Sequence, residues 1–215
     1  MIVLGIDGAL GAFSCAVVED GRCLASTELA GNVALEGGLG AVSAVLTQSQ
    51  TPPARLDRIA VGLGPGGFTG LRIALSYAKS LAQAWRLPIV GVSSFDALEA
   101  GLQTEPELLT VVSGRPGVVS VRLCGTVLRR ASGYVADVLD ALAADLPPVL
   151  AVLGAPEDVL AALGERGTHV HRIDRVIDPA ALAVALLAIE REPARSVHEL
   201  RADYGELPAA KVPAK

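Results

Sequence analysis

The sequence reads Gly62-Leu63-Gly64-Pro65-Gly66-Gly67-Phe68-Thr69-Gly70-Leu71-Arg72-Ile73 between an apolar run at 59–61 and a helical pattern that continues to Trp85. The apolar run predicts a buried strand, and the spacing of the apolar residues after the glycines predicts a helix. Glycines at such a junction let the backbone approach a phosphate or another chain without hindrance from a Cβ atom. This strand–turn–helix unit predicts an α/β fold, in which Thr69 is expected to cap the helix.

Apolar runs on both sides of this unit complete a first domain, for which we predict the bounds 1–103. The first three strands are expected to form an antiparallel meander, because Glu19-Asp20-Gly21 is typical of a hairpin turn. Ser94 is expected to cap the last helix of this domain. Strands are predicted at 2–6, 13–18, 23–29, 59–61 and 87–92, and helices at 35–50, 71–85 and 94–102.

The remaining residues, 104–215, predict a second, smaller α/β domain, with residues 103–106 as the joint. Asp178-Pro179 is expected to open the last helix, since Pro is favoured in the first helical turn. We expect the tail from Ala209 to be irregular. Strands are predicted at 108–112, 118–123, 126–129, 147–153 and 168–173, and helices at 135–144, 156–163 and 180–191.

Composition limits the kind of protein. The chain has 215 residues, 51% of them hydrophobic but only 3% aromatic, and a formal net charge of -5. An acidic chain with few aromatic residues is not typical of a protein that binds nucleic acid without a partner. Three single cysteines without a CxxC pair indicate reduced thiols. The start of the chain lacks a basic segment and no apolar run reaches the ~20 residues of a membrane span, so we expect a cytoplasmic protein.

Several catalytic motifs are excluded. Gly62, Gly64 and Gly67 fit the dinucleotide fingerprint in spacing, but the next strand does not end in an acid. No Gly-Lys-Ser/Thr follows the glycines, which excludes a Walker loop. His169 and His171 fall on one face of a predicted strand, where a solvated pair is favoured over a metal site. We therefore predict neither catalytic nor metal-ligating residues.

Three stretches resemble a known protein family. Residues 64–73 resemble the "GPGSFTGLRIG" signature of the bacterial TsaB family, also called YeaZ. Ile6-Asp7-Gly8-Ala9 resembles its "IDTA" start, and residues 88–94 resemble its "P-x-x-GVSSL" strand. The second half resembles the family only in plan, since Ser113-Gly114-Arg115 stands where the family has "DAR".

The resemblance implies two actin-like domains, each a mixed sheet with helices, as in sugar kinases and chaperone ATPases. It implies a cytoplasmic, non-catalytic subunit that helps to make the threonylcarbamoyl modification on adenosine 37 of tRNA. The implied partners are the catalytic homologue TsaD and the ATPase TsaE, with tRNA contacted only through the complex. No membrane contact is implied. The alternative is an enzyme, a small ATPase or phosphotransferase of the same superfamily.

Two groups of residues are candidates for these roles. We expect the first two helices of the first domain, predicted at 35–50 and 71–85, to form a partner surface, or a homodimer contact when the partner is missing, because both carry apolar residues on a second face. The other interpretation is that both helices are enclosed within this chain. The candidate partner residues are Leu35, Leu39, Val42, Val45, Leu46, Thr69, Arg72, Ile73, Tyr77 and Ser80. No cofactor is expected in the chain itself, unless a nucleotide (ATP or ADP) lies at the complex interface. The candidate phosphate turn consists of Asp7, Gly8, Gly64, Gly66 and Gly67, with a turn-stabilising role as the alternative for Asp7.

Overall fold

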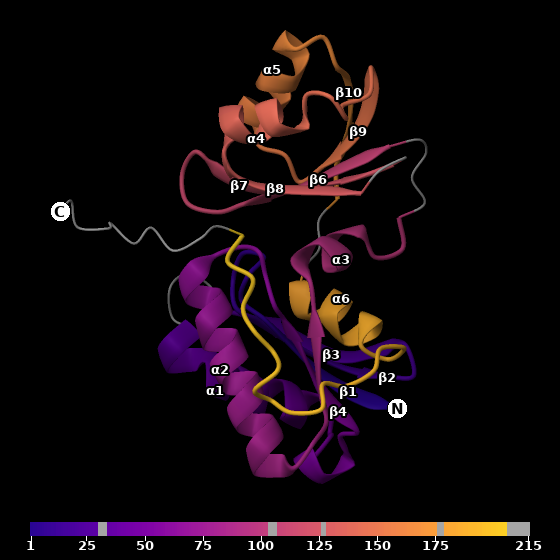
Figure 1. Cartoon of the computed structure of the whole chain (residues 1–215). Helices are drawn as coiled ribbons and strands as arrows, with labels where there is room; N and C mark the ends of the chain where they lie inside the picture. Colours follow the sequence, from indigo (N-terminus) through magenta and orange to yellow (C-terminus); the bar gives the residue numbers. More distant parts are fainter. Residues whose placement is uncertain (30–33, 103–106, 126–127, 176–178, 206–215) are drawn as a thin grey trace, which may run out of the picture.

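Two five-stranded sheets, one in each half of the chain, form the framework of the protein (Figure 1). The computed structural model describes residues 1–29, 34–102, 107–125, 128–175 and 179–205. The side chain of Leu35 is also outside the description. Four predicted features lie outside these residues, namely the joint at 103–106, the start of the strand predicted at 126–129, Asp178, and the tail from Ala209. In the described ranges no helix combines the length and the apolar character that crossing a bilayer requires.

The first sheet has the strand order β3-β2-β1-β4-β5. The first three strands form the predicted antiparallel meander, and β1, β4 and β5 run parallel to one another. This confirms every strand and helix predicted for the first half, with small shifts at their ends. The elements are β1 (Ile2–Asp7), β2 (Ser14–Glu19), β3 (Arg22–Glu28), α1 (Ala34–Gln48), η1 (Pro53–Arg55), β4 (Arg58–Gly62), α2 (Phe68–Trp85), β5 (Ile89–Val92) and α3 (Ser94–Glu99).

Two predicted helix caps are wrong by one or two residues. The N-cap of α2 is Gly67, so Thr69 lies inside the first turn and does not cap the helix. The N-cap of α3 is Ser93, whose Oγ accepts a hydrogen bond from the backbone N–H of Phe95 at 3.2 Å. An N-cap residue must keep a non-helical backbone, and Ser94 is already helical.

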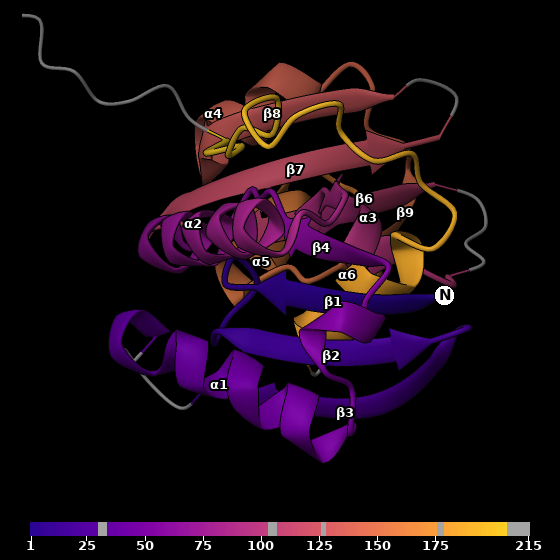
Figure 2. The ribbon, with the colours of Figure 1, turned by 90° about the horizontal axis from the view of Figure 1, so that it is seen from below.

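Helices cover both faces of the first sheet (Figure 2). Successive side chains of a strand point to opposite faces. Leu4 and Ile6 of β1 therefore enter the core under α1 and α2, while Val3 packs against α6 (Ala180–Leu187) on the other face. Gly5 allows this close packing, since a Cβ atom there would lie 2.3 Å from the carbonyl oxygen of Ala181. Burial on both faces explains the unbroken apolar run at the start of the sequence.

The second sheet has the order β10-β9-β6-β7-β8. The strands β6, β7 and β8 are antiparallel neighbours, whereas β9 runs parallel to both β6 and β10. Leu139 of α4 and Val159 of α5 pack into a second core on this sheet. The elements are β6 (Leu108–Ser113), β7 (Val118–Cys124), β8 (Arg129–Tyr134), α4 (Val135–Leu142), β9 (Val149–Leu153), α5 (Glu157–Glu165) and β10 (His169–Ile173).

The last part of the chain returns to the first unit, although the sequence assigned all of 104–215 to the second domain. The α6 helix packs on β1, β2 and β4. Residues 194–205, which we call the strap, then run beside α2 (Figure 1). The backbone N–H of Ala194 donates to the carbonyl of Ile89 at 2.9 Å, and that of Asp203 donates to Leu63 at 2.7 Å. The sequence of α6 is apolar on all sides; the first sheet and α3 cover most of the helix, and Leu186 stays 37% exposed.

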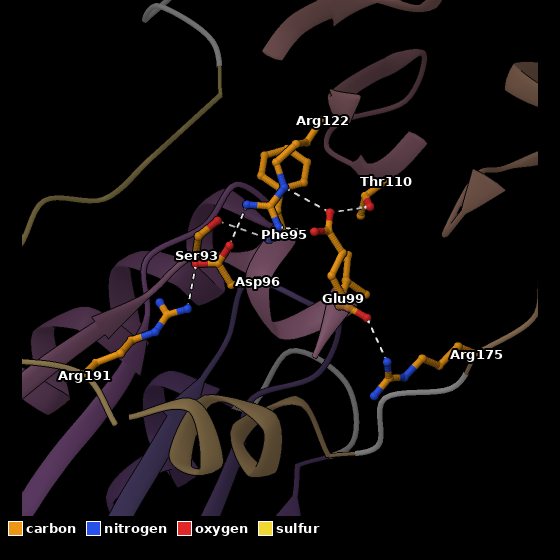
Figure 3. A network of polar contacts seen from close by, with 9 residues as sticks. Ser93, Phe95, Asp96, Glu99, Thr110, Arg122, Arg175 and Arg191 are labelled. Carbon is orange, nitrogen blue, oxygen red and sulfur yellow. Dashed lines mark hydrogen bonds and ion pairs between the residues drawn. The ribbon is translucent and has the colours of Figure 1, made fainter. Parts of the chain in front are cut away.

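Polar contacts join α3 to the second sheet (Figure 3). Arg122 in β7 is only 7% exposed, and its Nε donates to Oε1 of Glu99 at 3.0 Å. Asp96 accepts hydrogen bonds from both Arg122 and Arg191, the latter at 2.9 Å. The Phe95 ring centroid lies 5.2 Å from the guanidinium carbon of Arg122. These contacts position the second unit on α3.

Candidate functional site

The first strand ends in a buried carboxyl group, Asp7, beside the glycine turn. Asp7 is 1% exposed, and its Oδ2 accepts hydrogen bonds from the backbone N–H groups of Ala9 (3.0 Å) and Leu10 (2.9 Å). Its Oδ1 faces Gly62, where a Cβ atom would lie 1.9 Å away, and this oxygen has no hydrogen-bond partner among the described residues. Burial raises the pKa of Asp7 to about 6, against the opposing effect of the two N–H groups.

The glycine turn packs directly on the backbone that follows Asp7. The N–H of Gly67 donates to the carbonyl oxygen of Ala9 at 2.9 Å, and a Cβ atom on Gly66 would lie 2.1 Å from the same oxygen. Gly8 and Gly70 are equally close, since a Cβ atom on Gly8 would lie 2.4 Å from the Gly70 carbonyl oxygen. The members of the predicted phosphate turn therefore meet, and their glycines permit contact between two segments of the same chain.

Gly64 makes the corresponding contact with the strap. Its φ is +92°, and a Cβ atom on it would lie 2.2 Å from the carbonyl oxygen of Asp203. The strap therefore crosses the glycine turn at a distance that only glycine allows. The sequence indicated a close backbone approach at this turn but not that residues 203–205 make it.

The α1 and α2 helices pack on each other and leave apolar surface uncovered. Gly38 of α1 lies against the ring of Tyr77, so a residue without a Cβ atom lets the two helices pack closely. A depression of about 470 Å³ lies between α1, residues 50–53 after it and the carboxyl-terminal end of α2; Leu39, one of its lining residues, is 52% exposed. Its lining residues are Leu39, Val42, Ser43, Leu46, Thr47, Gln50, Thr51, Pro52, Pro53, Leu81 and Trp85.

A second depression, of about 380 Å³, lies along the first half of α2. Phe68 at its end is 56% exposed, and its ring centroid lies 5.1 Å from that of Tyr204 in the strap. The guanidinium carbon of Arg72 lies 5.1 Å from the same Phe68 centroid. The lining residues are Phe68, Thr69, Arg72, Ile73, Ser76 and Tyr77.

The sequence interpretation missed Phe68 and Tyr204 as surface residues. For Phe68 the sequence did contain a signal, which is that the few aromatic residues of the chain concentrate in one helix. They make up only 3% of the chain, yet Phe68, Tyr77 and Trp85 all fall within α2.

The structure divides the predicted partner residues into an outer and an inner group. Leu39, Thr69, Arg72 and Ser80 are exposed, and Ile73 and Tyr77 are half-buried. Val45 is completely buried in the first core, so the prediction that it lies on a partner surface is wrong. Val42 and Leu46 are also buried, but they line the first depression. Both helices are thus only partly covered by their own chain.

The described histidine and cysteine side chains lie apart from the glycine turn and from the two depressions. His169 and His171 are both exposed on β10, as predicted for alternate residues of a strand. Among the described residues, no group of three or more His, Cys, Asp or Glu side chains is placed to hold a metal ion. The three cysteines are unpaired, and burial raises the pKa of Cys15 to about 12.

Comparison of the sequence with known families gives one family model, described as TsaD, tRNA N6-adenosine threonylcarbamoyltransferase, which matches residues 35–165. The tRNA threonylcarbamoyladenosine biosynthesis protein TsaB of Bacillus subtilis is 30% identical over 229 residues, covering 98% of this chain and 96% of that protein. TsaB of Escherichia coli is 34% identical over 122 residues, covering 55% of this chain and 53% of that protein. The match thus spans about half the length of the E. coli relative and nearly all of the B. subtilis one.

Solved structures with the same fold include two informative neighbours. A Pseudomonas aeruginosa protein with similarity to the peptidase YeaZ has a TM-score of 0.72 at 23% identity, covering 95% of this chain and 99% of that one. A ROK hexokinase of Thermus thermophilus has a TM-score of 0.51 at 15% identity, covering 88% of this chain and 99% of that one. These likenesses confirm the predicted fold class, two α/β units of the actin-like and sugar-kinase type.

Proposed function

Since the chain belongs to the TsaB (YeaZ) family, we propose that it is a non-catalytic subunit in the synthesis of N6-threonylcarbamoyladenosine at position 37 of tRNA. In this role it binds and activates a TsaD-like homologue, works with a TsaE-like ATPase, and meets tRNA only through the complex. The observation that carries the proposal is the uncovered apolar surface of α1 and α2.

The shape and chemistry of this surface suit a helical partner. Two depressions of about 470 and 380 Å³ lie along α1 and α2, and apolar side chains such as Leu39 and Ile73 border them. Grooves of this kind accept the apolar face of another helix. The family model that describes TsaD matches this chain from residue 35, a range that contains nearly all of α1 and the whole of α2. The match supports a partner with a comparable helix pair, so that two pairs pack as a bundle.

Polar groups at the edge of the surface are suited to fix the orientation of the bound partner. Thr69 and Arg72 are exposed at the start of α2. The planar guanidinium of Arg72 is suited to a paired hydrogen bond with a partner carboxylate. Activation then follows if this surface binds one conformation of the partner better than the others, because a ligand shifts an equilibrium by its differential affinity.

The packing around Asp7 supports the non-catalytic role. An ATPase of this superfamily would use Asp7 and the glycine turn to hold a magnesium–phosphate group. In this chain Asp7 is 1% exposed, the backbone of Gly8 lies against Gly70 in the first turn of α2, and that of Ala9 lies against the glycine turn at Gly66 and Gly67. The enzyme remains the alternative, and it predicts magnesium-dependent ATP turnover by the isolated chain that Asp7→Ala abolishes.

Gel filtration of this chain with the TsaD-like protein of the same organism tests the proposal. We expect a complex that elutes earlier than either protein. The isolated chain is expected to self-associate through the same surface at high concentration, because association buries exposed apolar side chains. Light scattering measures this self-association. Absence of a complex at micromolar concentrations would contradict the proposal.

A further inference from the structure

The strap presents an aromatic side chain next to the α1–α2 surface. Tyr204 is 41% exposed, and its ring lies 5.1 Å from the ring of Phe68 at an interplanar angle of 38°. Arg72 packs on Phe68 as well, with its guanidinium carbon 5.1 Å from the ring centroid. Three residues from two distant parts of the sequence thus form one aromatic and cationic cluster, which we call the Tyr204 cluster.

The strap that carries Tyr204 is fastened to the first unit. Leu200 is 9% exposed and belongs to the first core. The Nζ of Lys79 in α2 donates to the Leu200 carbonyl oxygen at 2.7 Å, and the N–H of Asp203 donates to the Leu63 carbonyl at 2.7 Å. The N–H of Gly205 donates to Oδ1 of Asp203 at 2.9 Å. Tyr204 is therefore held in place before any partner arrives, which reduces the entropy lost on docking.

The Tyr204 cluster is continuous with the surface of the proposed function. Phe68 and Arg72 also line the second depression, together with Ile73 and Tyr77. We propose that Tyr204 belongs to the docking surface, so that the TsaD-like partner of the proposed function contacts the strap and α2 together. Tyr and Arg side chains are among the residues that contribute most to protein interfaces, which suits this cluster.

The end of the strap also contacts the second unit. A Cβ atom on Gly205 would lie 2.1 Å from Oγ of Ser120 in β7, and Ser120 accepts a hydrogen bond from Ser132 of β8 at 2.9 Å. A partner that contacts Tyr204 therefore docks where the first and second units meet, and not on the two helices alone.

Calorimetric titration of the TsaD-like protein with wild type, Tyr204→Ala and Tyr204→Phe tests the inference. We expect Tyr204→Ala to weaken binding about tenfold or more. Tyr204→Phe keeps the ring on Phe68 and should stay within about threefold of wild type. Thermal unfolding of each variant checks that the strap remains in place. The matched control is Leu186→Ala, because Leu186 is 37% exposed on α6, which covers the opposite face of the first sheet.

The inference rests on the proposed function, and the two fail in different ways. If wild type does not bind the TsaD-like protein, the proposed function fails and the inference with it. If wild type binds and Tyr204→Ala binds equally well, the proposed function stands and the inference is overturned. If Leu186→Ala weakens binding as much as Tyr204→Ala, the effect is not specific to the strap, which also overturns it.

Discussion

Arg122 of β7 and Glu99 of α3 face each other where the two units meet, with Nε of the arginine 3.0 Å from Oε1 of the carboxylate. Asp96 binds the same guanidinium. Burial alone would raise the pKa of Asp96, but hydrogen bonds from Arg122 and Arg191 outweigh it and hold that pKa below its ordinary value. Asp96 therefore stays ionised at neutral pH, and the arginine side chain ties the second sheet to the first unit.

Replacement of Arg122 by alanine is expected to lower the free energy of unfolding by about 2–4 kcal/mol. The change removes the cation that Glu99 and Asp96 share in a partly buried site, and it leaves Asp96 with Arg191 alone. Arg129→Ala is the matched control, because Arg129 is 52% exposed where it pairs with Asp145, and an exposed ion pair contributes about 1 kcal/mol or less. Urea denaturation followed by circular dichroism measures both. Equal losses in the two variants would contradict the structural role of Arg122.

The pH dependence of stability is expected to report Asp7. Burial raises its pKa in the folded protein to about 6, above the ordinary aspartate value of 3.8. The folded state therefore binds a proton more tightly than the unfolded state. The contribution of Asp7 to stability grows as the pH falls from 7 toward 4, and is lost as the pH rises through 6. Its full size is on the order of 3 kcal/mol.

Asp7→Asn isolates this contribution, since an asparagine does not titrate. Its Oδ1 still accepts the two backbone N–H groups that Asp7 binds. Chemical denaturation at several values between pH 4.5 and 7.5 is expected to give a much flatter profile for the variant than for wild type. Parallel profiles would show that Asp7 is already ionised or already hydrated in the folded protein.

Local patterns in the sequence predict most of the fold. Some elements can be assigned from their own residues alone. Unbroken apolar runs predict the buried strands β1, β4 and β9, and apolar residues at helical spacing predict α2. The glycines of residues 62–70 indicate a close approach of two backbone segments, because only a residue without a Cβ atom fits there.

Contacts between distant segments could not be predicted in this way. Arg122 and Glu99 are ordinary charged residues in the sequence, and only the placement of α3 on the second sheet makes them partners. The return of α6 and the strap to the first unit was missed because an apolar helix is compatible with either sheet. Val45 was assigned to the partner surface since helical spacing does not show which of two faces is covered.

The close packing of α1 on α2 predicts opposite effects for two glycines of α1. Gly40 has nothing near its Cβ position, so Gly40→Ala should raise the free energy of unfolding by about 0.5–1 kcal/mol through helix propensity. A Cβ atom on Gly38 would lie 2.4 Å from Cε2 of Tyr77, so Gly38→Ala should lower it by about 1–3 kcal/mol. Urea denaturation of both variants measures the difference. Stabilisation by both would mean that α1 and α2 are farther apart than described.

A charge on the exposed face of α1 is expected to prevent docking of the partner without unfolding the protein. Leu39 is 52% exposed at the edge of the larger depression, so Leu39→Arg should change the free energy of unfolding by no more than about 0.5 kcal/mol. The same change places a cation in an apolar contact, and we expect the affinity for the TsaD-like protein to fall at least about tenfold. Val149→Arg is the matched control, because Val149 is 50% exposed on β9 in the other unit. Calorimetric titration measures each affinity. Undiminished binding by Leu39→Arg would place the docking surface elsewhere on the molecule, whereas a loss in both variants would show that added positive charge alone disrupts the complex.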